Sequence, residues 1–175
     1  MSPYGGSISK PERTGGPLVP RTYKLANLQA LTVFPVSRKT VPDELLAYLQ
    51  GVFNDVVEEG RTYPQMNPLS LDEFPNYPGR SSHLCNGGFV VPTVHRGLRV
   101  GSTLGHSYLH YAPLLGYRGS VFNLVYVSNV ASVKIWDGLG FKRAGLIPGA
   151  GKLKGKDGAE DEYVDAIVYN YQFVN

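Results

Sequence analysis

The sequence has very little cysteine, tryptophan and methionine, and it has no long apolar run. Its 175 residues include one cysteine, Cys85, one tryptophan and two methionines. A single cysteine excludes an internal disulfide and is compatible with a reducing compartment. No run approaches the roughly 20 apolar residues of a membrane-spanning helix, and the first residues lack the apolar segment of a secretory signal. We therefore expect a cytoplasmic protein without a membrane partner, with a mitochondrial pool left open.

Charge of either sign is also modest. The chain has 17 lysines and arginines against 14 acidic residues, which gives a net charge of +3. Its basic residues are scattered rather than gathered into a stripe, so we expect no nucleic-acid partner. The histidines, acidic residues and Cys85 show no metal-ligand spacing, so we expect no bound metal. With no His–Cys pair in view, Cys85 is assigned to buried packing.

The length predicts one domain with a sizeable core. Residues 1–20 are rich in glycine, proline and serine without a hydrophobic period, and we predict that they form a disordered tail. Residues 21–175 then form the single domain. Within it, residues 61–80 hold four prolines and residues 149–163 are rich in glycine and charge, so both segments are expected to be loops.

The rest of the chain alternates between strand-like and helix-like runs. Strands are expected at residues 31–36, 88–92, 121–127, 141–147 and 164–169, and helices at 42–59, 100–115 and 130–139. The helix that starts at Pro42 is the clearest, because a proline and two acidic residues open it and Gly60 ends it. Gly51 is a point at which it could break in two. This alternation predicts an α/β domain, in three layers, with a mixed sheet flanked by helices.

Residues 95–101 read HRGLRVG and lead from an expected strand into an expected helix. A glycine-bearing turn at a helix N-terminus exposes N–H groups that suit a pyrophosphate. It is neither a P-loop nor a Rossmann fingerprint, because it lacks Gly-Lys-Ser/Thr and the three-glycine spacing. By itself, the turn is equally explained as an ordinary basic turn.

The order of these parts resembles the GCN5-related N-acetyltransferase (GNAT) superfamily: strand, Arg-Gly-x-x-Val-Gly, helix, apolar strand, Asn129, and a helix that ends in Leu-Gly-Phe. The resemblance implies acetyl-CoA as co-substrate, with no metal. The residues that would contact it are Phe89, Val90, Val91, Arg96, Gly97, Leu98, Arg99, Val100, Gly101, Asn129 and Trp136. Arg99 departs from the family pattern, which usually has glycine there. Trp136 stands where relatives often place a tyrosine that protonates the thiolate.

Several runs look more specifically like the fungal proline-analogue N-acetyltransferases. Among them are Thr62-Tyr63-Pro64-Gln65, Cys85-Asn86, FNLV at 122–125, KIWD at 134–137 and GLIP at 145–148. This resemblance implies detoxification of a small imino acid of the azetidine-2-carboxylate, hydroxyproline or pyrroline-carboxylate type, linked to oxidative stress. It implies Asn86 and Asn123 at the substrate, and Asn123 and Asn129 as the catalytic residues. A homodimer is left open.

The residues themselves leave other assignments open for these asparagines. Asn86 precedes two glycines and also suits a turn, and Asn129 also suits a helix cap. We expect Asn123, inside an apolar strand, to be buried and therefore either hydrogen-bonded or facing a ligand.

Relative to the superfamily, the chain is short between the first helix and residue 85, where a strand hairpin usually lies. We therefore expect the usual hairpin of strands 2 and 3 to be lacking and one wall of the acceptor site to be lost. Two other functions follow as alternatives. One is a non-catalytic acyl-CoA-binding module. The other is a protein or polyamine N-acetyltransferase, for which the acidic cluster at 157–162 is the candidate groove.

Overall fold

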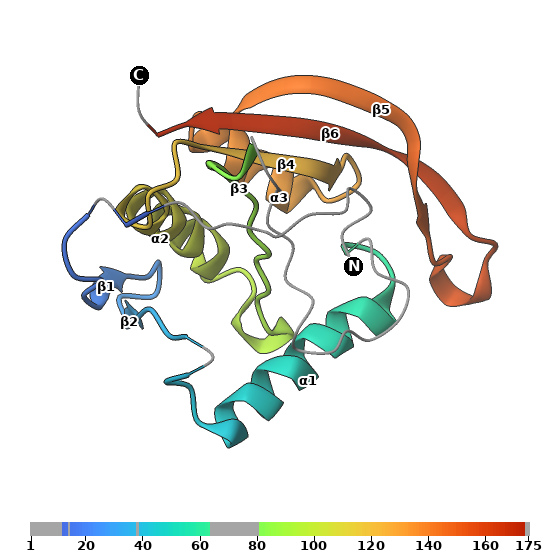
Figure 1. Cartoon of the computed structure of the whole chain (residues 1–175). Helices are drawn as coiled ribbons and strands as arrows, with labels where there is room; N and C mark the ends of the chain where they lie inside the picture. Colours follow the sequence, from blue (N-terminus) through green and yellow to red (C-terminus); the bar gives the residue numbers. More distant parts are fainter. Residues whose placement is uncertain (1–11, 14, 38, 64–80, 174–175) are drawn as a thin grey trace.

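A four-stranded mixed sheet, a separate two-stranded hairpin and three α-helices make up the described part of the computed structural model (Figure 1). The structure describes residues 12–13, 15–37, 39–63 and 81–173. The strands are β1 (Arg21–Lys24), β2 (Ala30–Val33), β3 (Leu84–Cys85), β4 (Gly119–Tyr126), β5 (Lys142–Leu153) and β6 (Glu162–Gln172). The helices are α1 (Asp43–Glu59), α2 (Val100–Leu114) and α3 (Val130–Gly138), with short 3-10 turns η2 (Thr93–His95) and η3 (Lys156–Gly158). No helix in these ranges is both long and apolar enough to cross a membrane.

The sheet has the order β3-β4-β6-β5. β3 runs parallel to β4, whereas β4 with β6 and β5 with β6 are antiparallel pairs, so the predicted mixed sheet is confirmed. β5 and β6 form a long hairpin that arches away from the rest of the sheet and turns down toward the end of α1 (Figure 1). Within the described ranges, β3 has no strand on its outer side, and the expected lack of a preceding hairpin stays a prediction. Residues 64–80, where remaining hairpin residues would fall, lie outside the described part.

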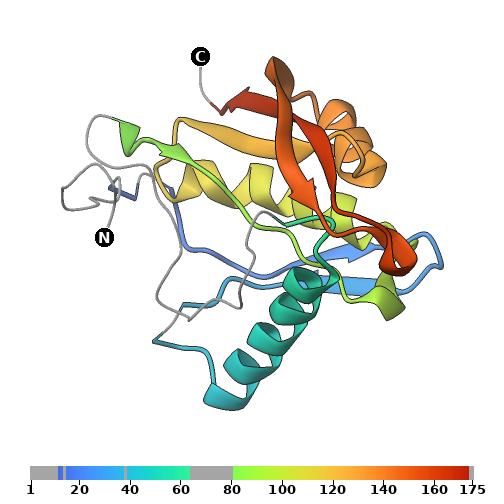
Figure 2. The same ribbon diagram turned by 90° about the vertical axis from the view of Figure 1, so that its right-hand side faces the viewer.

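The main core lies between one face of β4 and β6 and the two helices α2 and α3 (Figure 2). Its buried members are aromatic or branched: Phe122, Trp136, Phe141, Ile167 and Tyr169. The two helices can approach closely because α2 has glycine at the contact. A methyl group on Gly105 would lie 2.5 Å from Cδ1 of Leu139, too close for any real contact. A smaller cluster of Tyr126, Leu153 and Ala166 packs on the other face of the sheet.

The helix that the sequence predicts most clearly is present with the predicted ends. α1 starts after Pro42 and ends at Gly60, which adopts a left-handed conformation with φ of 68°. Gly51 does not break it, and the helix continues for 17 residues. Val56 and Val57 are its buried side chains, so packing of this face offsets the cost of one interior glycine.

The strand expected at 88–92 is not formed. β3 lies earlier in the chain and pairs with β4 through only two residues, Leu84 with Gly119 and Cys85 with Ser120. The apolar run after Gly88 instead belongs to no strand. An apolar run marks a buried segment but not a hydrogen-bonded partner, and this segment leaves β4 without a strand on its other side.

The charged loop expected at 149–163 is wrong at both of its ends. β5 continues to Leu153 and β6 already begins at Glu162, so only the tip of the hairpin is irregular. Glycines at 149 and 151 suggested a loop, but pairing with the apolar β6 decides the structure. Leu153 is buried to 1% exposure, which a solvated loop would not allow.

The strand expected at 31–36 is present as β2, which stops before Pro35 and pairs with β1. β1 was not predicted, because its four residues are mostly exposed and carry no apolar alternation. The hairpin is held to α2 by the hydroxyl of Tyr111, which donates to the Val19 carbonyl at 2.7 Å and lies 3.3 Å from that of Val33. Gly15 also donates its N–H to the Leu114 carbonyl, so the chain just before β1 is attached to α2. Residues 1–11 of the predicted tail lie outside the described residues.

Candidate active site

The glycine-bearing turn lies at the N-terminus of α2, as the sequence predicts. After η2, the chain turns through Gly97, which has φ of 78°, and Arg99, which has φ of 64°. The first helical hydrogen bond runs from the Thr103 N–H to the Arg99 carbonyl. The N–H groups of residues 100–102 precede that bond and have no acceptor within the helix, so they are available to an anion.

Arg96 holds this turn against the end of α1. Its Nε donates to the Val91 carbonyl at 3.3 Å, and its Nη2 pairs with the Glu59 carboxylate at 3.3 Å. Both side chains are about two-fifths exposed, so the pair is open to solvent and to competing anions. The glycine-bearing turn and the end of α1 are therefore neighbours.

Arg99 occupies a backbone conformation that favours glycine, the residue usual at this position in the resembling family. Its φ of 64° and ψ of 16° place it in the left-handed region as N-cap of α2. A left-handed L-residue costs about 1 kcal/mol relative to glycine. Replacing Arg99 with glycine is therefore expected to raise the free energy of unfolding by about 1 kcal/mol, measured by urea denaturation. Arg99→Ala keeps the strained backbone and should show no gain; an equal gain in both variants would contradict the backbone explanation.

β3 and β4 diverge directly after their short parallel pairing. Residues 86–92 then run to η2, and no backbone hydrogen bond joins 89–91 to β4 in the described part of the chain. The Phe89 ring fills the base of this divergence, with ring centroids 5.3 Å from Tyr108, 5.9 Å from Phe122 and 4.7 Å from Trp136. The backbone donors of residues 89–91 are thus left out of the sheet, as an oxyanion site requires.

A cavity of about 380 Å³ lies beside the carboxyl end of β4. Its wall comes from three separate parts of the chain: the end of α1, the start of α3 and the tip of the β5–β6 hairpin. The lining residues are Glu59, Arg61, Thr62, Ser128, Asn129, Val130, Ala131 and Lys156. Glu59 both lines this cavity and pairs with Arg96, so the cavity and the turn at α2 adjoin each other.

Asn129 has the cap position that the sequence allows and also lines the cavity. Its Oδ1 accepts from the Ser132 N–H at 3.2 Å, which satisfies one orphan donor of α3. Within the described part of the chain, its Nδ2 donates no hydrogen bond. One side chain can therefore cap α3 and still donate into the cavity.

Comparison with known proteins agrees with this arrangement. No family model matches the sequence. N-acetyltransferase aca1 of Schizosaccharomyces pombe is 52% identical over 99 residues, which are 57% of this chain and 46% of aca1. The chain thus spans less than half the length of the curated relatives it matches.

Solved structures resemble the chain over most of its length. A GCN5-related N-acetyltransferase from Kribbella flavida matches with a TM-score of 0.65 and 24% identity, over 75% of this chain and 94% of that one. The chain has the GNAT fold. A GNAT superfamily phosphinothricin acetyltransferase from Sinorhizobium meliloti, solved in complex with AcCoA, matches with a TM-score of 0.64 and 16% identity, over 77% of this chain and 86% of that one. The GNAT resemblance and the fold class are therefore confirmed, and the narrower likeness to proline-analogue enzymes stays a prediction.

The three asparagines predicted for the site lie in different surroundings. Asn129 lines the cavity, and the other two do not. Asn86 accepts a hydrogen bond from the Gly87 N–H on its Oδ1 at 2.7 Å, in a segment that is neither strand nor turn. Asn123 is exposed rather than buried, which corrects the expectation, because it falls at a register irregularity of the β4–β6 pair. Such an irregularity re-aims side chains, and sequence alternation alone does not locate it.

Trp136 is a core residue in this fold. It is 4% exposed, and its indole N–H donates to the Ser132 hydroxyl at 2.9 Å. The ring is enclosed by Phe89, Phe122 and Phe141. What the structure shows is therefore a packing role, while a contact between Trp136 and the cofactor stays a prediction.

Cys85 lies in a buried polar cluster at the point where β3 leaves β4. Its Sγ is 2.8 Å from the Tyr108 hydroxyl, which lies 2.8 Å from the Ser120 hydroxyl. Burial raises the pKa of Cys85 to about 11 and also raises the pKa of Tyr108. A thiol that stays protonated near neutral pH is a poor nucleophile, so the predicted packing role of Cys85 is confirmed. Within the described ranges, no group of His, Cys, Asp and Glu is placed to hold a metal ion.

Sequence reasoning missed Tyr63 and Arg61, which fix the end of α1 against the site. The Tyr63 ring packs edge-on against Phe53 at 4.9 Å, and its hydroxyl lies where any side chain at Gly88 would fall. Burial raises the pKa of the Tyr63 hydroxyl. The Thr-Tyr-Pro-Gln run at 62–65 could have drawn attention to Tyr63. It could not indicate that the tyrosine would contact the backbone at Gly88.

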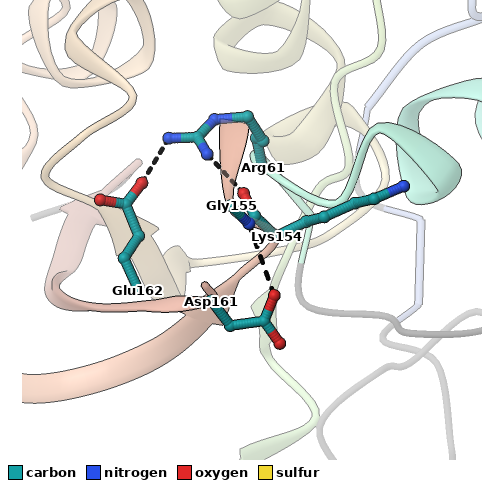
Figure 3. A network of polar contacts seen from close by, with 5 residues as sticks. All are labelled: Arg61, Lys154, Gly155, Asp161 and Glu162. Carbon is teal, nitrogen blue, oxygen red and sulfur yellow. Dashed lines mark hydrogen bonds and ion pairs between the residues drawn. The ribbon is translucent and has the colours of Figure 1, made fainter. Parts of the chain in front are cut away.

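Arg61 clamps the tip of the β5–β6 hairpin to the end of α1 (Figure 3). One guanidinium nitrogen donates to the Lys154 carbonyl and another pairs with the Glu162 carboxylate. Beside them, the Lys154 N–H donates to the Gly60 carbonyl at 3.1 Å. The Arg61 side chain is only 22% exposed, so these contacts are better shielded than an ordinary surface pair. Lys156 at the hairpin tip is thereby held in the wall of the cavity.

A second polar cluster joins α3 to the β5–β6 hairpin, through Asp137 on α3, Arg143 on β5 and Tyr169 on β6. Asp137 accepts two hydrogen bonds from Arg143 and one from the hydroxyl of Tyr169, which is fully buried as a residue. The hydrogen bonds from Arg143, and then that from Tyr169, lower the pKa of Asp137 below its ordinary value of 3.8. Its carboxylate therefore stabilises the folded chain above about pH 4, and this contribution is lost as pH falls through the lowered pKa.

Asp137→Asn is expected to reduce the pH dependence of the free energy of unfolding at acid pH. The free energy of unfolding of the unaltered chain should fall between about pH 5 and about pH 2 with a steeper slope than that of the variant. Urea denaturation at a series of pH values measures both slopes. Asp165→Asn serves as the control, because this carboxylate accepts from the Gly149 N–H and lies outside the cluster. Equal slopes in the unaltered chain and Asp137→Asn would contradict the prediction.

Proposed function

We propose that the chain is an acetyl-CoA-dependent N-acetyltransferase that acts on a small, proline-like imino acid. The observation that carries the proposal is the contact between Arg96 on the α2 turn and Glu59 in the cavity wall. It joins a turn suited to a pyrophosphate to a cavity of a size suited to a small acceptor. The name of aca1 and the bound AcCoA in the Sinorhizobium enzyme support the same chemistry.

Each part of the site would have a separate task. The N–H groups at residues 100–102 would hold the pyrophosphate, and the donors at 89–91 would stabilise the oxyanion that develops on the acetyl carbonyl. Asn129 Nδ2 would orient the thioester from the cavity side. Acetyl-CoA supplies the activated acetyl group, and the protein supplies orientation and hydrogen-bond donors.

A polyamine or basic-peptide acceptor is less well supported. Two acidic residues of the suggested groove are already paired, Asp161 with Lys152 at 3.2 Å and Glu162 with Arg61. They serve to hold the hairpin tip rather than to attract a cation. We propose a cytoplasmic enzyme whose product is a detoxified analogue, and a homodimer stays a prediction.

The test is a thiol-release assay with acetyl-CoA and azetidine-2-carboxylate, run beside calorimetry with acetyl-CoA alone. We expect binding of acetyl-CoA and acceptor-dependent release of CoA. Binding without turnover would favour the non-catalytic acyl-CoA-binding module instead. If the chain acetylates spermidine or a lysine peptide in preference to the imino acid, the imino-acid proposal is wrong and the chain is a polyamine or protein N-acetyltransferase.

A further inference from the structure

The cavity beside Asn129 carries charges of both signs from different elements. Glu59 comes from the end of α1, and Lys156 comes from η3 at the hairpin tip. Arg61 also lines the cavity, but its charge is paired with Glu162. An ordinary acyl-chain pocket would be lined by apolar side chains, so this wall points to a polar ligand.

We propose that this cavity is the acceptor site and that it binds a zwitterion, with Lys156 at the carboxylate and Glu59 at the protonated amine. This inference rests on the proposed function and extends it from the class of acceptor to the residues that recognise its two charged ends. The opposite charges arise on separate walls, as a ligand with two charged ends requires.

Lys156 is the cation of the cavity that is left for a ligand. Among the described residues it forms no ion pair, whereas Arg61 is engaged twice. The Arg61 clamp fixes Lys154, two residues before Lys156, to the end of α1. The position of the lysine is thus set by the fold before any ligand arrives, which reduces the entropy cost of binding.

Glu59 supplies a carboxylate that the sequence did not indicate as a base. Its partner Arg96 belongs to the turn that would hold the pyrophosphate, and their contact is solvent-exposed. An anion on that turn competes for Arg96 and leaves Glu59 to the amine of the acceptor. Binding of the co-substrate and readiness of the acceptor site are therefore linked through one ion pair.

The proton and bond changes balance with these groups. The secondary ammonium gives one proton to Glu59, and its nitrogen lone pair forms a bond to the acetyl carbon. As the carbon–sulfur bond breaks, the sulfur takes the electron pair, and the second proton of the nitrogen ends on the thiolate. The products are the N-acetyl imino acid, CoA as a thiol, and a proton on Glu59.

Binding is tested without turnover, by calorimetry on the full chain in the presence of CoA. The probes are azetidine-2-carboxylate and azetidine-2-carboxamide, which differ in the charged carboxylate. We expect the carboxylate to bind about tenfold more tightly, as hydrogen bonds to charged groups allow. Lys156→Ala should abolish this difference, and Lys134→Ala, at an exposed lysine on α3 outside the cavity, should preserve it. Equal binding of the two probes, no binding of either, or an unchanged preference in Lys156→Ala would overturn the proposal.

The role of Glu59 is tested by separating kcat from KM. Glu59→Gln keeps a hydrogen-bond acceptor but cannot take the proton, so we expect kcat to fall about 100-fold with a smaller change in acceptor KM. Glu58→Gln changes the neighbouring exposed carboxylate outside the cavity and should match the unaltered chain. Unchanged kcat in Glu59→Gln would remove the carboxylate from the site. Turnover without any preference for the zwitterion would overturn this inference and leave the proposed acetyl transfer intact.

Discussion

Replacing Arg61 with methionine is expected to lower kcat/KM for the acceptor about 100-fold while leaving acetyl-CoA binding nearly unchanged. Methionine keeps the apolar stem but removes the bond to the Lys154 carbonyl and the pair with Glu162 (Figure 3). The hairpin tip then loses its side-chain attachment to α1, and Lys156 loses its fixed place in the cavity wall. A displacement of about 1 Å in such a wall is enough for an effect of this size.

Two readouts separate this effect from a general loss of structure. Hydrogen exchange at the Lys154 amide, which donates to the Gly60 carbonyl, should accelerate in Arg61→Met while exchange in α2 stays unchanged. Glu162→Gln removes the ion pair but keeps the bond to Lys154, so its kinetic effect should be smaller. Full acceptor kcat/KM in Arg61→Met would show that the clamp does not position the cavity wall.

Truncating Trp136 to alanine is expected to lower the free energy of unfolding by about 3–5 kcal/mol. The side chain is 4% exposed and packs with ring centroids 4.6 Å from Phe122 and 4.7 Å from Phe89. α3 contacts β4 and the diverging 86–92 segment through this ring. The cavity left by alanine would therefore loosen the packing of β4 and of residues 86–92. Urea denaturation measures the loss.

Trp136→Phe provides the matched comparison. It keeps an aromatic ring but leaves the Ser132 hydroxyl without its indole donor, so the loss should be well below that of the alanine variant. A loss of less than about 1 kcal/mol in Trp136→Ala would contradict the packing role. Acetyl-CoA binding can be compared in the same two variants. If Trp136→Ala loses this binding and Trp136→Phe keeps it, the ring shape, and not the indole N–H, supports the binding.

The places where prediction failed share one cause. The run at 88–92 is apolar and was expected to be a strand, yet among the described residues no strand pairs with it. The glycine-rich stretch at 149–153 was expected to be a loop, yet β6 provides it with a partner. Strand formation depends on a neighbour elsewhere in the chain, whereas apolar and glycine patterns report only local preference.

The expected loss of an acceptor wall stays a prediction. What the tertiary structure shows is a cavity beside Asn129, whose walls come from Thr62 and Arg61 at the end of α1 and from Lys156 at the hairpin tip. Arg61 meets its partners 93 and 101 residues further along the chain. No spacing rule connects residues at such separations, so neither the clamp nor the opposite charges it brings together could be predicted.

The sequence by itself determined the helices, their caps, the glycine-bearing turn at α2 and the GNAT order of parts. These features depend on contacts within a few residues: Pro42 and Gly60 at the ends of α1, Gly97 in the turn, and Asn129 before α3. The tertiary structure decided the divergence of β3 from β4, the exposure of Asn123 and the charged cavity beside Asn129. Each of these requires segments distant in sequence to meet, and only the packing of the whole chain specifies which segments those are.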